Sequence, residues 1–319
     1  MSKNNANSDE VNKHSAASDH NDKLKTDSII KKFSTLKIWA NGDQRAPHKP
    51  LLILLALANC QQGRQRLLPF AELQEKLKQL LADFGPPRKL IRTVPPFWRL
   101  TKDGLWDIPG KNEIQVNSDG DPSNKALVSK NICGGFPADI FEFLACRPET
   151  IAKLANEILT EHFPETIHED ILLSVGLQPF DSNNAALKAK RDPDFRNKIL
   201  TVYRYQCAIC GFNLRLGNNP VCLEAAHIKW HQAGGPAIEQ NGIALCSMHH
   251  KMFDRGVFSL DEDYHVKASM HVNGSCGLDD WLYRYVGKQI ILPRSKDYFP
   301  ARPYTEWHFK EVFKDYESP

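Results

Sequence analysis

Two pairs of metal-ligand residues constrain this chain more than any other feature. Cys207 and Cys210 are separated by two residues, and Cys246 and His249 repeat that spacing further along. Two such pairs supply four ligands, which suits a closed tetrahedral Cys₃His zinc site. A closed site leaves no coordination position for a substrate. We therefore expect a structural Zn²⁺ that ties together a region with little core of its own.

The segment between and after these pairs contains a second group of polar residues. His227 follows a short strand-like run, Asn241-Gly242 is a typical turn pair, and His250 and Asp254 follow the second zinc pair. Asp254 lies four residues after His250, so the two side chains share one helix face.

Length and composition set only broad limits. A chain of 319 residues suggests two domains. Hydrophobic residues make up 41%, charged residues 25%, and the net charge is +3, which neither demands nor excludes a nucleic acid partner. The longest apolar run is too short to span a bilayer, and the N-terminus lacks the apolar segment of a secretory signal. We expect a cytoplasmic protein with no membrane partner.

Changes in composition divide the chain into four parts. The polar residues 1–27 are expected to form a disordered tail, and the turn-rich residues 176–192 a linker. Residues 28–175 combine amphipathic stretches with short strand-like or irregular pieces such as 97–100, which predicts a mainly helical domain with short strands. Residues 193–319 contain the zinc pairs. The predicted fold class is α+β.

The zinc pairs, His227, Asn241-Gly242 and His250 occur in an order that makes residues 192–260 resemble the HNH endonuclease family. More narrowly, they resemble its modification-dependent restriction branch, which carries zinc-ligand pairs on either side of the nuclease motif. The resemblance implies a ββα-metal fold and a metal-dependent DNA endonuclease. It makes His227 the general base that takes a proton from the attacking water, and Asn241 the residue that holds the loop positioning it. His250, together with Asp254, would bind a catalytic Mg²⁺, Mn²⁺ or another transition metal.

One position differs from the family pattern. Many members place an acidic metal ligand directly before the first His, where this chain has Ala226. Metal binding then rests on His250 and Asp254, with Glu224 as a weaker third candidate. The roles of His249 and His250 could also be exchanged, but the spacing within the second zinc pair favours His249 on zinc.

Two stretches of the first domain, 45–52 and 92–100, mix cations with prolines or aromatic rings. Cations hold phosphate, while rigid apolar rings offer a surface to an apolar group on DNA. With the turn at 134–137, these stretches make residues 28–165 resemble the sulfur-binding domain found joined to HNH nucleases. That family reads DNA in which sulfur replaces a non-bridging phosphate oxygen. Sulfur is larger, softer and less hydrated than oxygen, so a shallow apolar pocket should prefer it.

The resemblance to the sulfur-binding domain implies a set of DNA-binding residues. They are His48, Lys49, Arg92, Pro95, Pro96 and Phe97. Pro96 would be the proline ring of the pocket and Phe97 part of its wall. His48 and Lys49 would face the DNA backbone and bases. Several relatives have Tyr where this chain has Pro95, which changes one wall of the pocket.

These features together predict a type IV-like restriction endonuclease that binds phosphorothioate-modified double-stranded DNA and hydrolyses its phosphodiester bonds. Two alternatives stay open. The first domain could read a different base modification or an unmodified sequence, or the chain could be a non-cleaving, zinc-stabilised DNA-binding protein, which only Ala226 supports. Since each HNH unit nicks one strand, a homodimer is also open.

Overall fold

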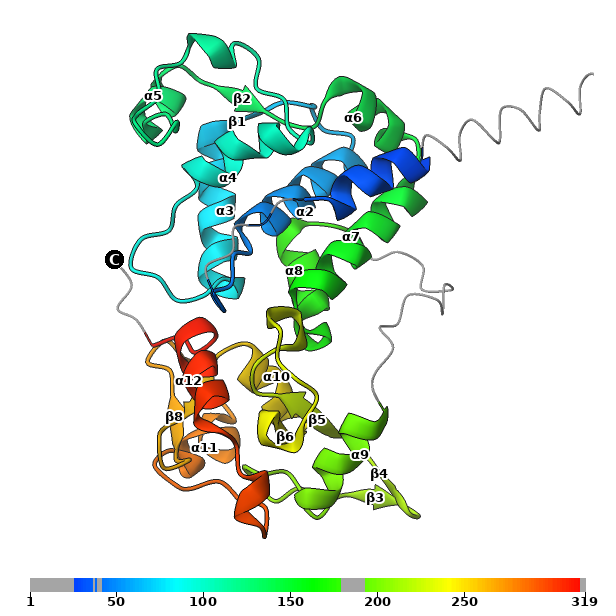
Figure 1. The fold of residues 1–319 in the computed structure, drawn as a ribbon, viewed down its shortest axis with the longest axis vertical. Helices are drawn as coiled ribbons and strands as arrows, with labels where there is room; N and C mark the ends of the chain where they lie inside the picture. The colour runs from blue at the N-terminus through cyan, green and yellow to red at the C-terminus, as the bar shows by residue number, and fades with distance from the viewer. Residues whose placement is uncertain (1–25, 37, 39–41, 179–192, 316–319) are drawn as a thin grey trace, which may run out of the picture.

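A computed structural model describes residues 26–36, 38, 42–178 and 193–315 (Figure 1). Most of the tail expected over 1–27 and of the linker expected over 176–192 lies outside these residues. Residues 26–34 form a helix, and Leu177 is buried in the core of the N-terminal domain. The described part of this domain therefore starts and ends at residues that were expected to belong to the tail and the linker.

The N-terminal domain is built around one buried helix, α2 (His48–Gln61), in which every residue from Pro50 to Cys60 is buried. A helix that is apolar on all sides must be enclosed by protein, and at least five helices of the described residues contact it. They are α3 (Phe70–Phe84), α4 (Val94–Arg99), α6 (Ala138–Ala145), α7 (Pro148–His162) and α8 (His168–Val175). The mainly helical character predicted for this domain is confirmed.

Short elements close the rest of the domain. They are β1 (Leu68–Pro69) and β2 (Cys133–Gly134), which pair antiparallel, together with η1 (Leu100–Asp103), η2 (Lys111–Glu113), α5 (Asn124–Ser129) and η3 (Glu165–Ile167). The prediction that residues 97–100 are strand-like or irregular is wrong, because they lie in α4 and η1. Prolines fit the first turn of a helix, where no amide donor is needed, so Pro95 and Pro96 start α4.

The C-terminal domain contains the ββα unit that its motif predicts. β5 (Leu223–His227) pairs antiparallel with β6 (Gly242–Cys246), and α10 (Ser247–Asp254) follows β6 without a break. Short segments surround this unit. They are α9 (Pro193–Val202), β3 (Arg215–Leu216), β4 (Asn219–Pro220), η5 (His231–Ala233), η6 (Glu239–Asn241), β7 (Phe258–Leu260), β8 (Val266–Ala268), α11 (Leu278–Trp281), η7 (Tyr283–Tyr285), η8 (Lys296–Tyr298) and α12 (Arg302–Glu311).

The two domains share part of one core. Trp230, Trp307 and Val312 of the C-terminal domain pack into the hydrophobic cluster of the N-terminal domain. In Figure 1, α10 and α12 lie on the side of the C-terminal domain that faces α3 and α8, and α10 contacts η3. Within the residues that the structure describes, no helix is both long and apolar enough to cross a membrane.

Candidate functional site

Gly242 lets α9 pack tightly against the strand pair of the ββα unit. This glycine begins β6 and pairs with His227 at the end of β5. A Cβ atom at Gly242 would come within 2.1 Å of the Ile199 side chain of α9. The absence of a side chain therefore lets α9 pack directly against the strand that leads into α10. This packing fixes the position of the end of β5, where His227 lies.

Asn241 holds the loop that follows His227. Its side chain is fully buried, and its Oδ1 accepts from the Lys229 amide at 2.8 Å. Its Nδ2 donates to the carbonyls of Lys229 at 3.0 Å and Pro236 at 2.9 Å. One side chain thus satisfies three backbone groups of the loop, which would be costly to leave unpaired. The structure thus places the Asn241 side chain across the loop that follows His227.

His227 faces a cavity of about 280 Å³, which we call the His227 cavity. Its ring stacks on Phe195 of α9, with 4.0 Å between ring centroids and 13° between planes. The polar residues that share this cavity are Glu165, Thr166, Arg196, Glu224, His231, Gln232, His250 and Asp254. The structure therefore brings His227, His250 and Asp254 together. Ala226, by contrast, is fully buried in the domain core.

His250 lies between two carboxylates. Its Nδ1 is 2.6 Å from Glu224 Oε2, and its Nε2 is 3.2 Å from Asp254 Oδ2. Burial lowers the pKa of His250, but the charges and hydrogen bonds of Asp254 and Glu224 outweigh this effect and raise the pKa to about 10. The two ring nitrogens point in different directions, so one metal ion on His250 can be shared with Glu224 or with Asp254 but not with both.

The surroundings of the two carboxylates favour the Glu224 side for a metal. The Asp254 side chain is 2% exposed, its Oδ1 accepts from the Trp230 indole at 3.1 Å, and its Oδ2 accepts from the Thr166 hydroxyl. The Glu224 side chain is 30% exposed and lines the cavity. Both carboxylates line the cavity, but a hydrolytic metal needs open positions for water and phosphate, which the more exposed Glu224 carboxylate can offer and the enclosed Asp254 carboxylate cannot.

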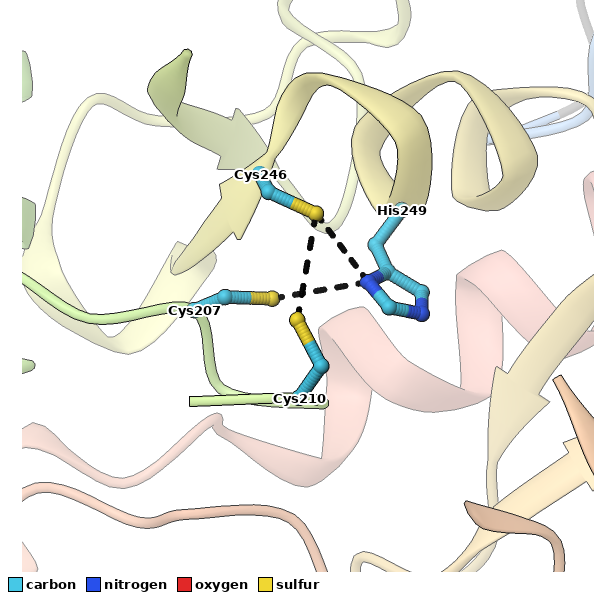
Figure 2. A group of neighbouring side chains, drawn as sticks. All are labelled: Cys207, Cys210, Cys246 and His249. Atoms are coloured by element: carbon cyan, nitrogen blue, oxygen red, sulfur yellow. Dashed lines mark hydrogen bonds between the residues drawn. The ribbon is translucent and has the colours of Figure 1, made fainter. Parts of the chain in front are cut away.

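The four residues of the two zinc pairs converge in space, as Figure 2 shows. Their ligand atoms all lie within 4.8 Å of one another. The Sγ atoms of Cys210 and Cys246 are 4.0 Å apart, and His249 Nδ1 lies 3.6 Å from Cys207 Sγ. Zn–S bonds of about 2.3 Å in a tetrahedron place sulfur atoms roughly 3.8 Å apart. This donor set therefore fits Zn²⁺.

The partner of the second His249 nitrogen also suits a metal ligand. His249 Nε2 donates to the carbonyl of Trp281 at 2.9 Å, an arrangement that fixes the ring with Nδ1 toward the cysteines. His249 is fully buried, whereas His250 lines the His227 cavity. Of the two roles left open by the sequence, the zinc role therefore fits His249 and the catalytic role fits His250.

A second concave site lies on the N-terminal domain. This cavity of about 610 Å³, which we call the proline pocket, combines an apolar wall with cations. Its lining residues are Ile38, Gln44, Arg45, Ala46, His48, Lys49, Pro86, Arg88, Leu90, Arg92, Pro95, Pro96 and Arg99. Five of the six expected DNA-binding residues are among them. Phe97 is not, because it points into the core and packs edge-on against Phe70 and Trp106.

Three cations of the proline pocket form ion pairs with neighbouring carboxylates. Lys49 pairs with Asp103 at 2.5 Å, Arg99 with Asp121 at 2.7 Å, and Arg88 with Glu311 at 2.7 Å. Burial, followed by the charge of Arg88, lowers the pKa of His48 to about 4. His48 is therefore a neutral ring at neutral pH, and the positive charge of the pocket comes from its lysine and arginines.

Several residues of the two sites carried no signal in the sequence. Thr166 and Trp230 donate to Asp254, and Arg88 lines the proline pocket while pairing with Glu311 of α12. Each of these contacts joins residues that are distant in the chain, so residue spacing does not reveal them.

Two segments of the chain match models of known families. Residues 26–180 match the model of the ScoMcrA-like DNA sulfur-binding domain, and residues 207–261 match that of the HNH endonucleases. The chain is therefore a DNA endonuclease. More particularly, it combines a ScoMcrA-like DNA sulfur-binding domain with an HNH nuclease domain, which we now call the reader domain (residues 26–178) and the nuclease domain (residues 193–315).

Three solved structures are similar to parts of this chain. The sulfur-binding domain of ScoMcrA complexed with phosphorothioated DNA is 22% identical, with 46% of this chain and 94% of that chain covered and a TM-score of 0.42. The corresponding SprMcrA complex is 20% identical, with coverages of 49% and 96% and a TM-score of 0.42. The type IV phosphorothioation-dependent restriction endonuclease ScoMcrA is 21% identical, with coverages of 47% and 30% and a TM-score of 0.39. No curated protein matches the chain.

The zinc assignment predicts a large effect of removing one ligand. We expect Cys210→Ser to lose the single bound zinc and to lower the melting temperature of the nuclease domain by roughly 10 °C or more, because each kcal/mol is worth about 3 °C in a domain of this size. Zinc content by elemental analysis and a thermal melt measure both effects. Cys276→Ser is the control, since Cys276 is an exposed thiol. A Cys210→Ser protein with full zinc and an unchanged melt would contradict the assignment.

Proposed function

We propose that this protein is a type IV-like restriction endonuclease that binds phosphorothioate-modified double-stranded DNA and hydrolyses its phosphodiester bonds. The observation that carries the proposal is the proline pocket, which combines prolines and cations in a domain of the DNA sulfur-binding family. The same chain supplies an HNH nuclease domain. Reading and cutting are therefore assigned to separate sites on one molecule.

The proline pocket suits a phosphorothioate better than a phosphate. The rings of Pro95 and Pro96 and the 67%-exposed side chain of Leu90 give it an apolar wall. The weakly hydrated sulfur can approach such a wall at a smaller desolvation cost than oxygen can. Arg92 and the other pocket cations can hold the remaining phosphate oxygens. His48, neutral at neutral pH, is suited to hydrogen bonding or stacking rather than to charge pairing.

In the His227 cavity, His227 is the general base. Its imidazole lies at the end of β5 and is held by the stack on Phe195 and by the Asn241 loop, so it can take a proton from an attacking water. Glu224 and the Nδ1 atom of His250 would hold the catalytic metal. When bound, that ion stabilises negative charge on the phosphate. The mixed nitrogen and oxygen donors suit Mn²⁺ or another first-row metal as well as Mg²⁺.

This assignment changes the expected role of Asp254. From the sequence, Asp254 was expected to bind the catalytic metal beside His250. Its enclosed carboxylate is better suited to accept from His250 Nε2 and so to turn Nδ1 toward Glu224, as carboxylates often do behind a ligating histidine.

A double-strand break needs two such nuclease sites or two successive cleavage events, and a homodimer would supply two sites.

The reader assignment is tested by binding to matched DNA duplexes. One set carries a single phosphorothioate flanked by randomised bases, and the other carries the ordinary phosphate at the same place. We expect selective binding of the sulfur set, and we expect Pro96→Ala to reduce that selectivity about tenfold because the apolar wall is opened. Pro148→Ala, outside the pocket at the start of α7, is the control. Equal binding of both sets by the unaltered protein would remove the sulfur-reading assignment.

The nuclease assignment predicts separable binding and cutting. His227→Ala should lower the cleavage rate at least 100-fold, the usual contribution of a general base, and leave the affinity for the phosphorothioate duplex unchanged. Single-turnover cleavage and a filter-binding assay on the same DNA measure the two quantities. His265→Ala, which alters a half-exposed histidine paired with Asp261, should cleave normally. Normal cleavage by the His227→Ala protein would show that another group is the base.

A further inference from the structure

The carboxylate of Asp254 is held by donors from both domains. Trp230 of the nuclease domain donates its indole N–H to Oδ1 at 3.1 Å, and Thr166 of the reader domain donates its hydroxyl to Oδ2. Asp254 is only 3% exposed, so its charge depends on these donors rather than on water. The third group near it is His250 Nε2, at 3.2 Å from Oδ2.

The position of Thr166 is set by the fold of the reader domain. Thr166 lies in η3, the short turn between α7 and α8, and η3 contacts α10 of the nuclease domain. On either side of it, Phe163 and Ile167 are buried in the reader core at 0% and 1% exposure. This anchoring holds the Thr166 hydroxyl against Asp254 as long as the two domains are docked.

The second donor to Asp254 also depends on the reader domain. Trp230 is 2% exposed and belongs to the reader core cluster although it lies in the nuclease sequence. The guanidinium of Arg45 lies 3.9 Å from the centre of its ring, a favourable cation–π contact. Arg45 itself lines the proline pocket. One donor to Asp254, Thr166, therefore belongs to the reader domain, and the other, Trp230, is packed against that domain.

We propose that Thr166 is a positioning residue of the nuclease site, through which the reader domain completes that site. Thr166 orients Asp254, Asp254 orients the His250 ring, and His250 then presents Nδ1 beside Glu224 for the catalytic metal. The inference rests on the proposed function of the His227 cavity. Partners behind a metal ligand typically change metal affinity or activity by about 10- to 100-fold when they are replaced, so an effect of this size is expected at Thr166.

Ion pairs between the two domains lie beside the contact of Thr166 with Asp254. Asp170 of α8 accepts from Lys251 at 2.9 Å and lies 3.6 Å from Arg255, and both cations flank the α10 residues of the site. These ion pairs keep α10 against η3 and α8. They explain how a single hydroxyl can hold a fixed position across a domain boundary.

The test compares Thr166→Val, which keeps the shape and removes the hydroxyl, with Thr166→Ser, which keeps the hydroxyl. Mn²⁺ binding to the zinc-loaded full-length protein without DNA is measured by calorimetry, and cleavage of phosphorothioate DNA is measured across Mn²⁺ concentrations. We expect Thr166→Val to weaken Mn²⁺ binding about tenfold and to raise the half-activating Mn²⁺ concentration by a similar factor. Thr166→Ser should resemble the unaltered protein, as should the control Thr35→Val, whose hydroxyl bonds to carbonyls of its own helix.

Binding of phosphorothioate DNA and the thermal melt serve as internal checks. If Thr166→Val lowers the melting temperature, a comparison of Thr166→Ser with Thr166→Ala tests the role of the same hydroxyl. In an Asp254→Ala background the Thr166→Val change should have no further effect, because the group that accepts the Thr166 hydrogen bond is gone. Unchanged Mn²⁺ affinity in Thr166→Val, or faster cleavage by it, would overturn the proposal. If the unaltered protein cuts no DNA, the proposed function fails, while the Mn²⁺ comparison still reports on Thr166.

Discussion

The nuclease site depends on two short segments that meet around one metal position. Cys207 and Cys210 follow α9, and Cys246 and His249 stand at the start of α10. Consecutive residues of a helix point about 100° apart. Fixing His249 on the zinc cluster therefore aims His250 away from it, into the His227 cavity. One structural ligand set thus determines both where α10 begins and which of its histidines is available for chemistry.

Buried charged residues also join the two domains. Glu311 of α12 is 5% exposed and accepts from the Arg45 amide at 3.1 Å and from the Arg88 guanidinium at 2.7 Å. Burial lowers the pKa of Arg45 to about 9 against the opposing effect of Glu311. Arg45 and Arg88 also line the proline pocket. The pocket assigned to reading and the helix that closes the nuclease domain therefore share side chains, and the two domains form one packed unit.

The sequence predicts best what is encoded locally. The two-residue spacing of Cys207–Cys210 and Cys246–His249 and the Asn241-Gly242 turn act over a few residues, so the zinc cluster and the ββα unit could be predicted. The metal-binding role that we propose for Glu224 in place of Asp254 could not be predicted, because it depends on which nitrogen of His250 each carboxylate faces. Phe97 was expected in the pocket wall, but the helix that Pro95 and Pro96 start turns it into the core.

The central claim is that a sulfur-reading domain directs this nuclease to modified DNA. The most direct test is cleavage of two plasmids of identical sequence, one from a phosphorothioating host and one unmodified, by the zinc-loaded protein with Mn²⁺. Cutting of the modified plasmid alone is the predicted result. Equal cutting of both plasmids would contradict the claim by leaving a nuclease without a sulfur reader, and cutting of neither would contradict the nuclease assignment.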